Sequence, residues 1–320
     1  MKVALIIALI ALIVGAILCG IGWVLLQKYP VEKNTVKDAV YEYRIEEAPT
    51  QIQITTLDSR VELRPTTEDQ WKVACTDRED LYHTVELVDG VLTVKQIGTV
   101  RKWYEYIGIF NGGLQGLSVT VYLPEQVYES LAVHSTSGSI KVQEGLIFSN
   151  ASLQNTSGSI LCNSRVSGSL NVKNTSGSIT VGGNVGGDLN VQNTSGSITV
   201  SGGVHGKLDV TNGSGSIEIK NATPTSATVK NTSGSIDLIN VVCQGACEVT
   251  NTSGSVELDH CDAASFDLKT TSGGIRGTVL TDKTFDCRST SGSVRVPENG
   301  EGGTFKARTT SGGIKITVSE

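Results

Sequence analysis

A short run of residues, in variants of Asn-Thr-Ser-Gly-Ser-Ile, returns along the chain at a nearly fixed interval. A Ser-Gly step of this kind occurs ten times, and successive steps lie 19 or 20 residues apart. A period this regular predicts a repeat architecture in which each repeat stacks on its neighbours. The steps are Ser137-Gly138, Ser157-Gly158, Ser176-Gly177, Ser195-Gly196, Ser214-Gly215, Ser233-Gly234, Ser253-Gly254, Ser272-Gly273, Ser291-Gly292 and Ser311-Gly312.

Each repeat, numbered from its glycine as zero, carries apolar residues at fixed positions on both sides of the step. Positions −7, −5 and +2 are apolar throughout, position +4 is apolar except at Gly277, and the residues between are mostly polar. This alternation predicts two short strands per repeat, each with one buried face. Glycine, serine and asparagine favour a turn between them.

One repeat alone cannot bury enough apolar surface to offset the entropy of ordering its chain. Stacking the repeats as parallel strands supplies both hydrogen bonds and a continuous core. Crossover connections between parallel strands are nearly always right-handed. We therefore predict an all-β fold, a right-handed parallel β-solenoid of ten regular 19–20-residue coils plus divergent N-terminal coils.

The chain before the repeats divides into several segments. Residues 3–26 contain no charged residue and are long enough for one transmembrane helix, preceded by a two-residue tail (1–2). A cleaved signal peptide and a lipid-modified Cys19 are the alternatives. Residues 27–50 are predicted to form a linker, 51–130 divergent coils that cap the solenoid, and 131–320 the regular repeats.

Within the predicted cap, the repeat pattern returns around Ser59, with Ile52, Ile54, Val61 and Leu63 at the apolar positions. Alternating residues on both sides of Asp89-Gly90 predict a β-hairpin. Between the hairpin and the repeats lies an aromatic segment, which is either a contact loop for a partner or membrane surface, or a plug for the open end of the solenoid. Its aromatic residues are Trp103, Tyr104, Tyr106 and Phe110.

At the far end, phenylalanine occupies position −7 of the last three repeats, at Phe266, Phe285 and Phe305. We expect these rings to stack. The strand that contains Ile316 is predicted to be an exposed edge, where either Lys315 discourages pairing with other strands or a second copy of the chain pairs.

The run Val119-Thr120-Val121-Tyr122-Leu123-Pro124, followed by Leu131-Ala132-Val133 and the Ser-Gly-Ser-Ile coils, resembles a bacterial putative-adhesin domain family of unknown function. The resemblance covers about residues 51–318. It implies a membrane-anchored β-solenoid of the bacterial cell envelope. It offers no catalytic residues to carry over.

Few residues suggest chemistry. The four histidines occupy no repeated position, so neither a catalytic residue, a cofactor site nor a metal site is predicted. Cys243 and Cys261 fall in the return segments of adjacent coils and are a candidate disulfide pair. Asn-x-Ser sequences recur at the turns, where a structural role is more plausible than glycosylation. The net charge of −6 and the lack of a basic stripe argue against nucleic-acid binding.

These observations favour a non-enzymatic envelope protein, attached to the membrane by its N-terminal helix, with the solenoid outside the cytoplasm as an adhesin-like surface for a protein or glycan. One alternative is a sensor or regulator of envelope stress signalling. Another is a polysaccharide-active enzyme, for which Asp237, Glu257 and Arg276 at position +3 are the candidate side chains. The oligomeric state is left open by the sequence.

Overall fold

The structure is a computed structural model that describes residues 39–98 and 116–319. These residues form strands and turns, and within them there is no helix able to cross a membrane. The predicted transmembrane segment 3–26 and the four aromatic residues Trp103, Tyr104, Tyr106 and Phe110 lie outside the described residues.

The strands follow one another in short, closely spaced segments. In the N-terminal part they are β1 (Ala39–Ile45), β2 (Gln51–Thr56), β3 (Arg60–Thr66), β4 (Trp71–Asp77), β5 (Leu81–Val88), β6 (Val91–Gly98), β7 (Ser118–Pro124), β8 (Val127–Ser137) and β9 (Ile140–Val142). In the middle they are β10 (Ile147–Ser157), β11 (Ile160–Cys162), β12 (Arg165–Val166), β13 (Leu170–Ser176), β14 (Ile179–Val181), β15 (Leu189–Ser195), β16 (Ile198–Val200), β17 (Lys207–Ser214), β18 (Ile217–Lys220), β19 (Ser226–Ser233), β20 (Ile236–Ile239) and β21 (Val242–Ser253). At the C-terminal end they are β22 (Val256–Ser272), β23 (Ile275–Val279), β24 (Thr284–Ser291), β25 (Val294–Arg295), β26 (Thr304–Ser311) and β27 (Ile314–Val318).

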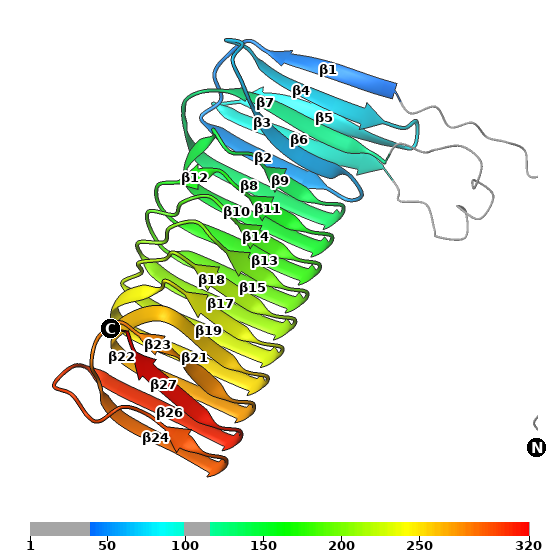
Figure 1. Cartoon of the computed structure of the whole chain (residues 1–320). Helices are drawn as coiled ribbons and strands as arrows, with labels where there is room; N and C mark the ends of the chain where they lie inside the picture. The colour runs from blue at the N-terminus through cyan, green and yellow to red at the C-terminus, as the bar shows by residue number, and fades with distance from the viewer. Residues whose placement is uncertain (1–38, 99–115, 320) are drawn as a thin grey trace, which may run out of the picture. The chain divides into compact units, whose positions relative to one another are not determined.

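Each coil contributes one strand before its Ser-Gly step and one after it, so the strands form two parallel sheets that meet at the corner. The pre-corner sheet contains β8, β10, β13, β15, β17, β19 and β21, and the post-corner sheet contains β9, β11, β14, β16, β18 and β20. The long strand β22 belongs to both sheets. The predicted β-solenoid is therefore confirmed as a class (Figure 1).

The ten corner glycines form a single column. All ten have positive φ, from 107° to 159°, which favours glycine. In addition, a Cβ atom on any of them would overlap with the backbone carbonyl of the corner in the adjacent coil. Glycine is needed here for close approach between coils as well as for the turn.

The predicted inward positions form one continuous apolar core between the two sheets. Leu189, Val191, Ile198 and Val200 of a central coil are each at most 1% exposed. Gly277 takes the one inward position without a side chain, and there the carbonyl and side chain of Leu258 leave no room for a Cβ.

At the N-terminal end, spatial order differs from chain order. Strand β2 lies between β6 and β8, and β3 lies between β7 and β9, so the first coil is the second in space. Antiparallel strands then cover the end: β4 pairs with β7, β1 pairs with β4, and β5 pairs with β6. The β5–β6 hairpin turns at Asp89-Gly90, both with positive φ, as its sequence predicts.

The C-terminal end shows the same exchange, and here the sequence prediction is wrong. Strand β26 lies between β22 and β24, and β27 lies between β23 and β25. The strand that contains Ile316 is therefore an inner strand, and the outermost coil is the one that contains Gly292 (Figure 1). The coils are interchangeable because they present the same inward residue types, so the repeat pattern alone does not fix their order.

The three phenylalanine rings stack as predicted, but in the exchanged order. The ring centroid of Phe305 lies 5.1 Å from that of Phe266 and 5.5 Å from that of Phe285. Phe305 is fully buried in the middle of the stack, whereas Phe285 is only partly buried.

This order predicts a difference between two alanine variants. Phe305→Ala should lower the opening free energy of the last coils by about 3–5 kcal/mol, because it leaves a cavity between two rings. Phe285→Ala should cost about half as much, because its ring is already partly in water. Native-state hydrogen exchange of amides in β26 and β27 measures both effects, and a larger loss for Phe285→Ala would instead support a stack in chain order.

Candidate functional site

The recurring asparagines have a structural role in the column of corners. Each donates a hydrogen bond from Nδ2 to the carbonyl oxygen of the corner glycine in the adjacent coil, as from Asn193 to Gly177 at 3.0 Å. The same bond occurs from Asn155, Asn174, Asn212, Asn231 and Asn251, at 2.7–3.0 Å. Their side chains are buried, which makes glycosylation at these Asn-x-Ser sequences incompatible with the folded coil.

The exchanged coils follow the same rule with shorter side chains. Thr309 donates to the carbonyl of Gly273 at 2.9 Å, and Ser289 donates to that of Gly312 at 2.7 Å. The corner glycines and the polar residues at position −3 are thus explained by stacking.

The first corner, at Ser59, is held in a different way. Gln96 on β6 accepts hydrogen bonds from the backbone N–H groups of Leu57 (2.6 Å) and Asp58 (2.9 Å). His83 on β5 is hydrogen-bonded through Nε2 to Oγ of Ser59 at 2.9 Å. Two side chains of the cap hairpin therefore hold the corner of the coil beneath it.

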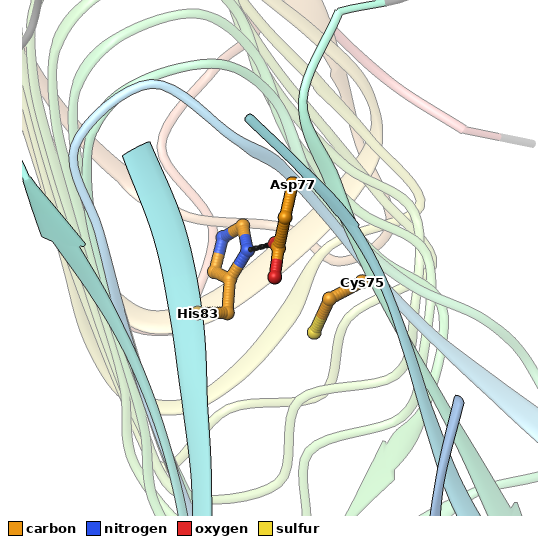
Figure 2. Close-up of side chains that lie close together, drawn as sticks. All are labelled: Cys75, Asp77 and His83. Atoms are coloured by element: carbon orange, nitrogen blue, oxygen red, sulfur yellow. Dashed lines mark hydrogen bonds and ion pairs between the residues drawn. The ribbon is translucent and has the colours of Figure 1, made fainter. Parts of the chain in front are cut away.

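A cluster of chemically capable side chains surrounds this contact. Nδ1 of His83 lies 2.5 Å from Oδ1 of Asp77, and Cys75 precedes Asp77 by two residues on the same inward face of β4 (Figure 2). Ser59, Cys75, Asp77 and His83 are all buried, with at most 4% of each residue exposed. We call these four residues the cap cluster.

Three members of the cap cluster form a chain of hydrogen bonds from Asp77 through His83 to Ser59. In hydrolases, this arrangement activates a serine for nucleophilic attack. Here Ser59 is 0% exposed, so a substrate cannot reach its Oγ unless the cap opens. The arrangement instead satisfies a buried carboxylate, which would be costly to leave without a partner.

The cap cluster also contains three metal-ligand types. The ligand atoms of Cys75, Asp77 and His83 all lie within 4.8 Å of one another. However, both ring nitrogens of His83 are already within hydrogen-bond distance of other groups. Burial, and secondarily the charge of Asp77, raises the pKa of the Cys75 thiol to about 12, which favours the protonated form. The observed geometry is that of a hydrogen-bonded cluster.

The cap cluster was not predicted from the sequence. Cys75, Asp77 and His83 come from β4 and β5, which lie outside the repeat, and antiparallel pairing brings them to Ser59, at the corner of a degenerate coil, only after folding. The one available signal was an isolated Cys-x-Asp near the only histidine that lies before residue 100.

Cys243 and Cys261 do not form the candidate disulfide in the structure, where both are buried free thiols. The register explains this, because Cys243 is opposite Ala263 while Cys261 is opposite Val279 in the other sheet. Burial raises the pKa of Cys261 to about 11. Cys247 lies on the same strand as Cys243, and its pKa is raised. The largest cause is the hydrogen bond with Cys243, and the second is burial.

The outer surface of the post-corner sheet carries a column of segregated charge, which we call the charged stripe. At position +3, Glu218, Asp237 and Glu257 lie on successive strands, and Arg276, Lys315 and Arg295 continue the column. Neighbouring strands are about 4.8 Å apart, so like charges in register repel one another. A shallow hollow in the surface is lined by five of these six residues.

The pre-corner sheet also holds like charges in register, because Lys269, Arg308 and Arg288 lie on neighbouring strands and Glu248 lies beside Asp267, but ion pairs within this sheet offset them. Lys269 forms an ion pair with Asp267 at 2.8 Å, and Arg308 forms one with Asp286 at 2.5 Å. On the charged stripe, among the described residues, the contact of Glu218 with Lys220 at 2.9 Å is the one ion pair, so most of its like charges are not offset in this way.

The stacked glycine corners, the bonds from position −3 and the antiparallel cap define the chain as a capped β-solenoid. It belongs to the Toastrack DUF4097 family, whose model matches residues 50–242 and 226–320. This confirms the family resemblance predicted from the sequence.

Solved structures that are similar to this chain have low sequence identity to it. One is a "putative adhesin" from Bacteroides fragilis, with 14% identity, 88% of this chain and 97% of that chain covered, and a TM-score of 0.36. Another is a "putative lipid binding protein" from Parabacteroides distasonis, with 14% identity, 88% and 98% coverage, and a TM-score of 0.36. A "putative adhesin" from Parabacteroides merdae has 12% identity, 89% and 97% coverage, and a TM-score of 0.28. No curated protein matches the chain.

The cap cluster makes a stability prediction. His83→Leu should lower the opening free energy of the cap by about 3–5 kcal/mol, because it leaves the buried carboxylate of Asp77 without its hydrogen-bond partner. Hydrogen exchange of amides in β4 and β5 measures the loss. His134→Leu, at an exposed position on β8, is the control and should change exchange by less than about 0.5 kcal/mol. Equal effects of the two variants would show that the cluster does not hold the cap.

Proposed function

We propose that this protein is a non-enzymatic, membrane-anchored component of the bacterial cell envelope whose solenoid is an adhesin-like interaction surface. The observation that carries the proposal is the charged stripe. The column places three acids side by side and three bases side by side, and within the described part of the chain only Glu218 among them has an ion-pair partner, Lys220. A partner with complementary charges relieves the remaining repulsion.

The rest of the molecule supports a binding role over a catalytic one. The core between the sheets is filled, and the repeated serines serve the corners. The carboxylates Asp237 and Glu257 share their column with Arg276 on an open sheet face, whereas polysaccharide cleavage needs paired carboxylates that flank a bound sugar. The partner we propose is a protein or an anionic glycan of the envelope.

The stripe can be tested by charge reversal. Arg276→Glu with Lys315→Glu should weaken co-sedimentation of the full chain with isolated bacterial cell envelopes about tenfold, because two exposed charge contacts are worth about 0.5–1 kcal/mol each. Raising the salt concentration should reduce binding by the unchanged protein.

The matched control for this test is Lys173→Glu with Lys230→Glu, which makes the same change in net charge on the pre-corner face. The control should bind as the unchanged protein does. If both double variants lose binding equally, net charge rather than the stripe governs the interaction.

The proposed placement of the solenoid outside the cytoplasm has its own test. A membrane-impermeant amine reagent applied to intact cells should label exposed solenoid lysines such as Lys173 and Lys230. Peptide mapping identifies the labelled sites. Labelling that appears only after cell lysis would place the solenoid inside and contradict the envelope surface role.

A further inference from the structure

The two ends of the solenoid are unlike each other. Antiparallel strands cover the N-terminal end, whereas no strand among the described residues lies beyond β24 and β25 at the other. The inward side chains of this last coil are accordingly incompletely covered. Phe285, Cys287 and Val296 are partly buried, and Val294 is 38% exposed, although the matching positions of central coils are buried.

The backbone of β24 also shows which of its groups face outward. The N–H of Thr284 donates to the carbonyl of Gly303, which immediately precedes β26, whereas the N–H of Phe285 donates to Oδ1 of Asn299 at 2.7 Å. Successive residues of a strand direct their N–H and C=O groups to opposite edges. The backbone groups of Phe285, Cys287 and Ser289 therefore face the uncovered edge, and Asn299 occupies one of them.

The side chains between these residues have opposite charges. Asp286 and Arg288 flank Cys287 and point to the outer face of the sheet, where Arg288 is well exposed. An antiparallel strand of the same sequence, centred on Cys287, places Asp286 opposite Arg288 twice. A pairing centred on Asp286 places two acids opposite each other, and one centred on Arg288 places two bases opposite each other, so charge selects the register.

We propose that the uncovered end binds a second copy of this chain, with β24 pairing antiparallel with β24 of the other copy about a two-fold axis at Cys287. In the register that the charges select, the residues that face each other at the centre are those whose backbone groups point to the uncovered edge. It makes Cys287 a hydrogen-bonded pair with itself, which gives two backbone hydrogen bonds, and the flanking pairs of Phe285 with Ser289 form when Asn299 releases the N–H of Phe285. The two pre-corner sheets become continuous, and the partly exposed side chains of each last coil are covered by the other. A self-complementary edge of this kind fits an isologous dimer.

The test uses the full chain, purified in a mild detergent because residues 3–26 are apolar, with protein mass measured by light scattering over a concentration range. The unchanged protein should form dimers. Arg288→Asp should weaken dimerisation at least tenfold, because it places Asp opposite Asp286. The double variant Asp286→Arg with Arg288→Asp restores opposite charges and should dimerise within about threefold of the unchanged protein.

The control is Lys230→Asp, which makes a comparable charge reversal at the same repeat position in a central coil and should leave dimerisation unchanged. A second measurement does not depend on any variant. In the proposed pairing the Cα atoms of the two Cys287 residues are about 5.5 Å apart, so a short bis-maleimide should join them. Peptide mapping then identifies a Cys287–Cys287 link.

Several outcomes would overturn the proposal. They are a monomer at every concentration, a dimer that Arg288→Asp leaves unchanged, a double variant that folds but stays monomeric, or a cross-linked dimer in which Cys287 is not joined to Cys287. A dimer that Arg288→Asp leaves unchanged would locate self-association elsewhere in the chain. Each of these results is distinct from a failure of envelope binding, because the charged stripe lies on the other sheet.

Discussion

The close approach of backbones at the corner column is the constraint on which the fold depends. At that column, the glycine carbonyl of one coil occupies the space that a side chain would need in the next. The carbonyl then accepts a hydrogen bond from position −3 of the neighbouring coil. One short motif therefore makes the turn, sets the spacing between coils and gives the glycine carbonyls their hydrogen bonds. This explains why the motif varies so little along the chain.

The cap shows how this constraint is relaxed where the repeat ends. Ser59 replaces the corner glycine, and the cap hairpin supplies His83 and Gln96 to bind the first corner from above. The resulting cluster contains the residue types of an active centre. Because it is buried, its role is to connect the cap hairpin to the first corner. Side-chain identity alone is a poor guide to chemistry when the atoms have no access to a substrate.

Much of the fold was predictable from the sequence because the period, the inward positions and the corner residues are local properties. The buried state of Leu189, Val191 and Ile198 and the turn at Asp89-Gly90 follow from patterns within a few residues. Spatial order was not predictable, because Phe285 and Phe305 occupy equivalent positions and either coil satisfies the same pattern. The cap cluster and the free thiols of Cys243 and Cys261 depend on antiparallel pairing and on exact register, which no short pattern contains.

The exchanged order of the last two coils has a consequence for synthesis. As the chain leaves the ribosome, the coil around Gly292 emerges before the coil around Gly312, on which it finally rests. The coil around Gly292 must therefore remain undocked until the coil around Gly312 is in place. Otherwise, it must pair temporarily with β22 and then be displaced from it by β26. The solenoid can grow coil by coil as far as Gly273, but its last two coils are completed together, after the coil around Gly312 has been synthesised.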